Sequence, residues 1–581
     1  MRILRIPSFR AWLFCLAFFP LPAVVAAGPA EDPALGDQPV AVNQVGYVTD
    51  RPKRFTAPLA ADGTRFAIRL AEGGPPLFRG EIEEGIGDFS SFRPEDSKRR
   101  YVVLVESKGG ENAVSDPFLI RSGLLQEQFW QPAVDFLVDS RSVVGTHASA
   151  YGACPWRDGT YYDAILPALV LFYLADPERV EAMPKQIDWA ADKARIEAPG
   201  FRMAEDGKKS IGALDATLGY FQLPPPAPEA PDVIKLIHWG AGYYLTKPDT
   251  RDPSMDPAGN KIHSQTLEQL SYVLWTWPNL EPWLPQELYE GLLELCFENW
   301  EAAGALGIPA KWDPGTYIKP DKVTPRKLHP YKGRHAPGHS IVPNLLMHEV
   351  ALREGRDDAP RYLEAAVKQA AWIIENLDWD DPRTTKGHRM SEHRTIPNLV
   401  WLLQKYPDAA PAGLREKIEQ WVDVAIARSG NLWDYRRYDM DTHWSIPDMN
   451  DLGNILSLPA IAIAAGWVVE DPEKKQRLEE LAFAAVDHVF GRNPRLAAAP
   501  AKPEMGFPEI ERGWPKKYPE DVCARLELCR GSLSSAPGSE MFPFNPEGEY
   551  RHPEGWVNYG ASWCISLAYL EIDAAKTSAK P

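Results

Sequence analysis

The segment LEELAFAAVDHVF, residues 478–490, shows most clearly what kind of structure the larger part of this chain forms. A set of its apolar residues recurs at spacings of three and four, which places them on one face of a helix. They are Leu478, Leu481, Ala482, Ala485, Val486, Val489 and Phe490. The pattern predicts a helix over 472–490 with one buried face.

Other segments after residue 124 have the same helical periodicity, and many of them would carry apolar residues on most faces of the helix. They lie near 163–174, 177–196, 232–245, 264–275, 285–303, 339–353, 360–377, 394–405, 413–428, 450–469 and 557–572. Helices of this kind pack against neighbours on two sides. With the first helix they number twelve, which predicts an all-α (α/α)6 barrel over 124–575. A helical solenoid is the competing architecture, but no fixed-period repeat supports it.

Residues 38–121 have a different pattern, in which short segments alternate apolar and polar residues. These segments are PVAVNQVGYV, RFTAPLA, TRFAIRLA, RYVVLVES and DPFLIRS, and Gly, Pro, Asp and Asn separate them. Several short strands at this spacing predict a β-sandwich of roughly 85 residues. The chain is therefore expected to be multidomain.

The first 27 residues are typical of a secretory signal peptide. Three arginines precede the apolar run WLFCLAFFPLPAVV, and small residues follow at 26–28. An uncleaved membrane anchor is the alternative, but the run is short for a span and contains Pro20 and Pro22. We expect export to the periplasm or the medium, with no membrane association after cleavage.

Composition excludes several classes of function. A net charge of −17 argues against a nucleic-acid partner, which needs clustered Lys and Arg. No zinc-type Cys/His spacing, Walker loop or dinucleotide fingerprint occurs, so no metal or cofactor is expected. The 20 Trp and 21 Tyr suit stacking on sugars as well as helix packing. One of the six Cys lies in the predicted signal peptide, and the odd number left implies at least one free thiol or an intermolecular bond. Cys523 and Cys529 are close enough in sequence to form a disulfide that closes a loop.

Both ends of the chain resemble glycoside hydrolase family nine. VNQVGY at 42–47, GDFS at 87–90 and DPFLI at 116–120 resemble the immunoglobulin-like domain that precedes many cellulases of this family. FGRNP at 490–494 and EGWVNYGASWCISLAYL at 554–570 resemble segments of its barrel. The resemblance implies an immunoglobulin-like β-sandwich followed by an (α/α)6 barrel, and hydrolysis of a β-linked glycan with inversion.

The same resemblance implies the catalytic residues. The family's acid is a Glu six residues before an Asn-Ala pair, and here Glu554 lies six residues before Gly560. The family's GGWxDAGD is similar to CPWRDGTYYDA at 154–164, where Asp158 matches the first Asp and Tyr161 falls on the second. Tyrosine, with a pKa near 10, is a poor base at neutral pH. Asp158 is therefore expected as base or base-assisting residue, with Asp163 as a weaker substitute.

Glycoside hydrolysis needs one protonated carboxyl and one carboxylate. They stand about 6.5–9.5 Å apart in inverting enzymes and about 5–5.5 Å apart in retaining ones. Burial beside aromatic rings would raise the pKa of Glu554 as the acid requires. The structural alternatives are a solvated loop acid for Glu554 and a helix cap for Asp158.

Two further clusters are candidates for sugar binding: GHRMSEHRTIPN at 387–398 and WDYRRYDMDTHWSIPDMND at 433–451. Helix capping, ion pairs and Trp packing explain them equally well. The side chains expected to line a cleft are Trp156, Tyr161, Arg389, His393, Trp433, His443 and Trp444.

Three functions stay open. The first is an exported glycoside hydrolase that acts on a β-linked oligo- or polysaccharide. The second is a lyase that cleaves an acidic glycan by elimination, because these clusters contain arginines and Tyr161 replaces an acid. The third is a binding or scaffold protein that kept the barrel and lost activity.

Overall fold

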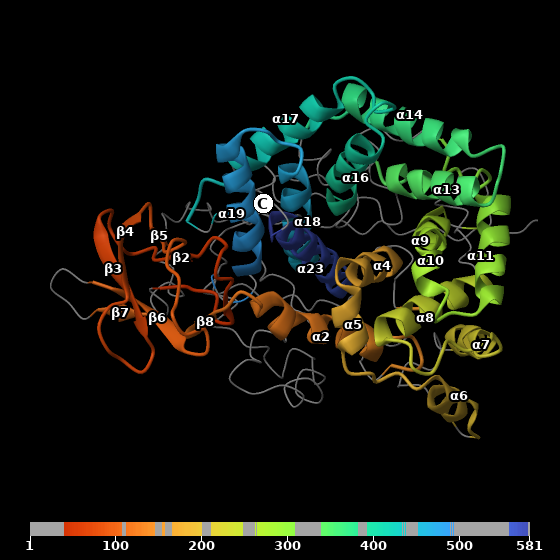
Figure 1. Cartoon of the computed structure of the whole chain (residues 1–581), viewed down its shortest axis with the longest axis horizontal. Coiled ribbons are helices and arrows are strands. Elements are labelled where there is room, and N and C mark those ends of the chain that lie inside the picture. Colours follow the sequence, from red (N-terminus) through yellow and green to blue (C-terminus); the bar gives the residue numbers. More distant parts are fainter. Residues whose placement is uncertain are drawn as a thin grey trace, which may run out of the picture.

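The computed structural model describes residues 40–106, 112–145, 154–156, 165–199, 201, 211–247, 262, 264–307, 338–380, 392–432, 434, 436, 451–487, 490, 492 and 557–578. Strands come first along the chain and helices follow, as Figure 1 shows. This order confirms the predicted change from strands to helices. No helix in the described part is both long and apolar enough to cross a membrane.

The strands form one sheet, with β1 and β2 at its two ends. Its order is β1-β8-β6-β3-β4-β5-β2, and β7 pairs with β6. The strands are β1 (Gly46–Tyr47), β2 (Arg54–Thr56), β3 (Thr64–Leu70), β4 (Phe78–Glu83), β5 (Ile86–Asp88), β6 (Arg100–Val105), β7 (Ala113–Val114) and β8 (Phe118–Ile120). Aromatic rings fill its core, such as Phe55 edge-on to Phe66 with centroids 4.9 Å apart.

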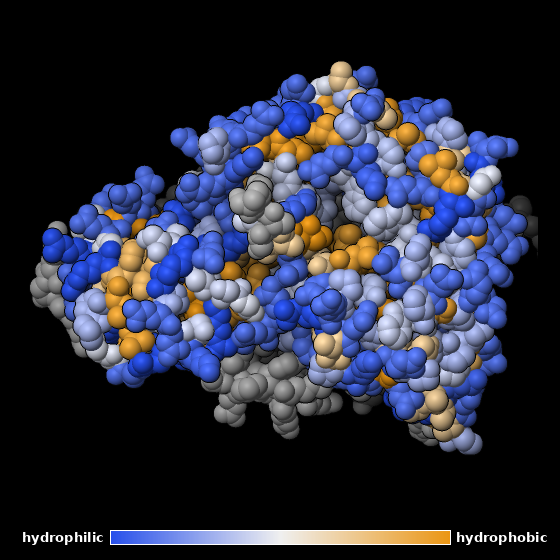
Figure 2. Space-filling model, viewed as in Figure 1, coloured by the Kyte–Doolittle hydropathy of each residue, from blue (hydrophilic) through white to orange (hydrophobic). Residues whose placement is uncertain are grey.

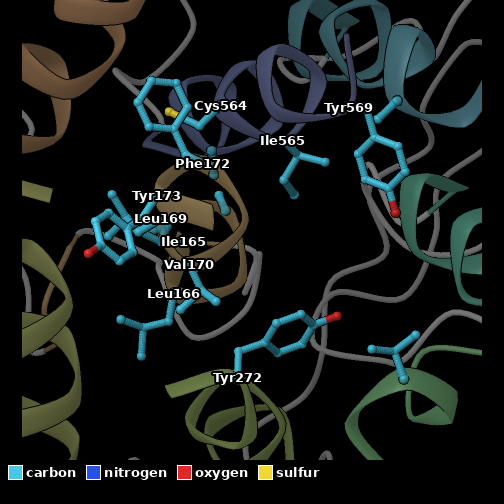
Figure 3. Packing of buried hydrophobic residues seen from close by; sticks show 14 of the residues in the cluster. Ile165, Leu166, Leu169, Val170, Phe172, Tyr173, Tyr272, Cys564, Ile565 and Tyr569 are labelled. Carbon is cyan, nitrogen blue, oxygen red and sulfur yellow. The ribbon is translucent and has the colours of Figure 1, made fainter. Parts of the chain in front are cut away.

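Six of the described helices form a closed ring. Each packs against the next in the order α4-α9-α13-α16-α18-α23, and α23 packs against α4. They are α4 (Ile165–Ala175), α9 (Ser264–Trp275), α13 (Ile341–Arg353), α16 (Glu392–Lys405), α18 (Asp451–Gly466) and α23 (Val557–Ser578). Figure 3 shows side chains of α4 packed near Cys564 and Ile565 of α23, with Tyr272 of α9 below them. The ring is therefore closed by apolar packing between the first and last of these helices.

A second set of helices lies outside this ring. They are α2 (Leu124–Asp139), α8 (Asp232–Thr246), α11 (Gln286–Asn299), α14 (Pro360–Asn376), α17 (Leu414–Ala427) and α19 (Pro472–Asp487). Helix α2 packs on α23, α8 on α4, α11 on α9, α14 on α13, α17 on α16 and α19 on α18. Shorter helices α5 (Pro177–Ala182), α6 (Trp189–Glu197), α7 (Ile211–Tyr220) and α10 (Trp277–Leu280) connect them.

Two expectations about helices are corrected. The single helix expected at 177–196 is divided into α5 and α6, because Pro184 forces the preceding Met183 out of the helical region, at φ −64° and ψ 149°. Helix α2 was not among the expected helices, and it contains Pro132. Its apolar residues are nevertheless buried against the ring, and tertiary packing outweighs the cost of that proline.

Candidate active site

The amino-terminal ends of neighbouring ring helices meet. The backbone N–H of Leu166, in the first turn of α4, donates to the side chain of Gln269 in α9 at 3.4 Å. Glu268, also in α9, accepts from the hydroxyl of Ser340 at 2.5 Å, just before α13 begins. His339 Nδ1 lies 2.6 Å from the other oxygen of Glu268. The loops that carry most of the predicted site residues enter the ring helices at this end.

The segment 154–156 is firmly held. The ring of Trp156 is only 1% exposed, and its indole N–H donates to the carbonyl of Leu137 at 2.9 Å. The carbonyl of Pro155 accepts from the backbone N–H of Ser142 at 2.9 Å and from the indole of Trp239 at 2.9 Å. In this structure Trp156 anchors the segment in the core, and its contact with a substrate stays a prediction.

The start of α23 packs closely on the end of α2. A Cβ placed on Gly560 would lie 2.6 Å from Cδ1 of Phe136 and 3.6 Å from a methyl of Leu137. A side chain at this position would force the phenylalanine ring to move. This contact gives a physical reason for the glycine that stands where the family's motif has asparagine.

These two contacts bring distant parts of the chain together. Gly560 and Trp156 both touch the carboxyl-terminal end of α2, the first through packing on Leu137 and the second through a hydrogen bond to its carbonyl. Asp158 is two residues beyond Trp156, and Glu554 is three residues before α23 begins. The described residues next to Asp158 and Glu554 in sequence thus meet at one end of one helix.

Most predicted site residues lie outside the described residues. These are Glu554, Asp158, Tyr161, Arg389, Trp433, His443 and Trp444, together with Asp163, Cys523 and Cys529. His393 is in the first turn of α16, where the structure describes the backbone alone. The described cysteines Cys296 and Cys564 are free thiols, and the thiol of Cys154 contacts the carbonyl of Trp156.

In the cluster at 433–451, Asp434 forms ion pairs with three arginines. Asp434 is buried and lies 2.8 Å from a nitrogen of Arg54 in β2, 2.8 Å from Arg477 in α19 and 2.7 Å from Arg492. Burial alone would raise the pKa of this carboxyl, but the guanidinium groups of Arg492, Arg54 and Arg477 hold the pKa below its usual value. We call these four residues the docking cluster, because it joins the sheet to the helices.

A second buried acid lies beside the docking cluster. Asp487, at the end of α19, accepts from the side-chain amide of Asn43 at 2.9 Å. Burial raises its pKa to about 7, although Arg492 and the Asn43 hydrogen bond act in the opposite direction. The acid is therefore largely neutral in the folded protein below that pH.

Comparison with known proteins identifies the fold. No family model matches the sequence, and a search of curated proteins gives no significant match. Among solved structures, AaCel9A in complex with cellobiose-like isofagomine superimposes with a TM-score of 0.50 at 13% identity, over 92% of this chain and 100% of that chain. The chain has a fold like that of family nine glycoside hydrolases.

Two further structures are similar over the same share of the chain. A mutant thermostable endoglucanase from Alicyclobacillus acidocaldarius has a TM-score of 0.48 at 14% identity, covering 92% of this chain and 99% of that one. A Bacteroides ovatus GH9 protein gives the same four values. The assignment of the family-nine-like fold rests on the first structure alone.

Sequence reasoning missed the buried polar residues at the amino-terminal ends of the ring helices. Glu268, His339 and Ser340 contact one another, but they are separated by some seventy positions in the sequence. No motif joins them. The only local signal is a polar residue just before an apolar helix, which is ordinary for a helix start.

Proposed function

We propose that this chain is an exported glycoside hydrolase that cleaves a β-linked oligo- or polysaccharide, with Glu554 as general acid and Asp158 as base. The observation that carries the proposal is the meeting of their flanking segments at the end of α2. These segments lie about four hundred residues apart in sequence, and the packing of α4 on α23 brings the described residues beside them together.

The finer architecture belongs to the same proposal. A ring of helices with a second set outside it is the arrangement that an (α/α)6 barrel needs, and the single curled sheet of 46–120 is compatible with an immunoglobulin-like sandwich. The domain limits 38–121 and 124–575, after a signal peptide at 1–27, are proposed with it. Inversion, which needs room for a water between the carboxyls, follows from the family resemblance.

The roles of the two acids differ. Glu554 would donate a proton to the leaving oxygen, and Asp158 would accept a proton from the attacking water. Trp156 would act as a positioning residue, because it fixes the chain two residues before Asp158. The side chains at 161, 389, 393, 433, 443 and 444 are proposed to contact the sugar.

A screen of the purified mature chain against neutral and acidic polysaccharides tests this proposal. We expect new reducing ends on a β-linked neutral glycan, without absorbance from unsaturated products. Glu554→Gln should lose at least 100-fold in rate, since general acid catalysis contributes roughly 10²–10⁴-fold. Glu549→Gln, the same change five residues earlier, is the matched control and should keep full activity.

The other outcomes decide between the alternatives. Unsaturated products from a uronate polymer would establish the lyase. Binding of glycans without any product would establish an inactive binding protein. Full activity of Glu554→Gln would remove the acid assignment.

A further inference from the structure

The opposite end of the helical ring contains a pocket of about 350 Å³. Residues from the carboxyl-terminal parts of α4, α9, α16 and α23 line it, and so does the residue that follows α18. Four of its eleven lining residues are aromatic: Trp275, Trp401, Trp467 and Tyr569. The pocket is therefore distinct from the amino-terminal ends of α4 and α23, which follow the proposed catalytic residues in the sequence.

A larger hollow of about 990 Å³ adjoins this pocket and extends to the sheet. The two share Gln404 and Trp467 in their linings, so they lie next to one another. We call the two hollows together the aromatic groove. Figure 2 views the molecule from this side and shows a hollow at the centre, with apolar residues inside it and hydrophilic residues around it.

Fixed contacts set the orientation of the aromatic rings. Trp467 stacks on Tyr569 with centroids 5.3 Å apart and planes at 18°, and its indole N–H donates to Asp573 at 3.0 Å. Trp275 donates its indole N–H to Glu349 at 2.8 Å, and Trp401 stands edge-on to it. The rings are held in place by these neighbours, whether or not a ligand is bound.

One face of Trp467 carries a lysine. The ammonium of Lys576 lies 3.3 Å from the centroid of the ring, while the side chain itself is on the exposed surface. A lysine stem has many rotamers and moves at little cost. A ligand can therefore replace it on the ring face.

The charges along the groove nearly balance. Its lining carries Arg51, Lys405, Lys475 and Lys576 against Asp50, Glu479 and Asp573, and Lys405 lies 3.8 Å from Glu349. An acidic glycan would call for an excess of arginine and lysine. A purely apolar ligand would displace water from these charged side chains without giving them hydrogen-bond partners, which is unfavourable. A neutral ligand with apolar faces and many hydroxyls satisfies both the rings and the rim.

We propose that the aromatic groove is a second binding site for a neutral saccharide, at the end of the ring opposite to the proposed catalytic residues. The interior between the two ends is filled by buried side chains of the ring helices. Helix α4, with 11 residues, separates them by roughly 17 Å. The groove thus binds its saccharide independently of any hydrolysis.

Calorimetric titration with a β-linked glucose hexamer tests the site, in the Glu554→Gln background to prevent cleavage. Trp401→Ala should weaken binding at this site at least fivefold, because a stacking face is lost. Lys576→Ala should bind at least as tightly as its parent, because it uncovers Trp467. Trp189→Ala is the matched control: that ring is also partly buried and also carries a lysine, Lys193, but it lies in α6 away from the groove.

Several results would overturn the proposal. Equal binding by the Trp401→Ala and Trp189→Ala variants would show that the groove takes no part. Tighter binding of a uronate hexamer, or of an alkyl chain, would refute the ligand class. A chain that binds the hexamer in the groove but hydrolyses no glycan would refute the proposed enzyme and keep this site, so the two failures are distinguishable.

Discussion

Replacing Asp434 by Asn removes the negative centre of the docking cluster. The side chains of Asp434 and Arg492 are 3% and 1% exposed, so the change leaves Arg492 buried without its ion pair. Breaking a buried ion pair by removing one partner costs about 3–5 kcal/mol. Arg54 and Arg477 keep Glu480, at 3.0 and 2.9 Å, which reduces the loss. We therefore expect a decrease of about 3 kcal/mol in the free energy of unfolding.

Urea unfolding at pH 7, followed by far-ultraviolet circular dichroism, measures this loss. The matched control is Asp88→Asn, the same change in a second partner of Arg54 that is 51% exposed at 3.8 Å. An exposed pair of this kind contributes about 0–1 kcal/mol. A loss below 1 kcal/mol for Asp434→Asn, or equal losses in the two variants, would refute the role given to the cluster.

The pH dependence of this loss has a definite sign. The folded-state pKa of Asp434 is below that of the unfolded chain, so its contribution is complete above the unfolded pKa of about 3.9 and disappears as the pH falls through the folded value. The difference in the free energy of unfolding between wild type and Asp434→Asn should therefore become smaller only below about pH 4.

Three other predictions concern single contacts. Burial raises the pKa of Asp487 to about 7, so the ionised carboxylate lowers the free energy of unfolding as the pH rises from about 4 to 7. Asp487→Asn should therefore raise the melting temperature at pH 8 but not at pH 4.5, and equal effects at both pH values would contradict this. Gly560→Ala should lower the free energy of urea unfolding by about 1–3 kcal/mol through overpacking on Phe136, whereas Gly219→Ala in α7, with its nearest contact at 3.8 Å, should not. Trp156→Phe loses one buried hydrogen bond and should cost about 1–2 kcal/mol, with a lower kcat and little change in KM, because the segment before Asp158 loosens; an unchanged kcat would exclude a positioning role.

Periodicity predicted what depends on local sequence. Helix α4 was placed within two residues because all its faces are apolar, and alternation located β1, β2, β3, β6 and β8 but not β4, β5 or β7. Contacts between distant segments left no such signal. Asp434 was expected as a possible sugar ligand, but arginines from β2, α19 and position 492 surround it. The tight approach of Gly560 to Phe136 likewise depends on how α2 and α23 pack.

The rate of cleavage as a function of leaving group tests the proposed mechanism most directly. A general acid matters for a sugar leaving group, which needs a proton, and hardly at all for dinitrophenolate, which does not. Glu554→Gln should therefore lose roughly 10²–10⁴-fold in kcat/KM on a glucose oligomer but less than about tenfold on dinitrophenyl β-cellobioside. Asp158→Asn should lose similar factors on both substrates. Equal losses for Glu554→Gln on the two substrates, or none, would contradict the account.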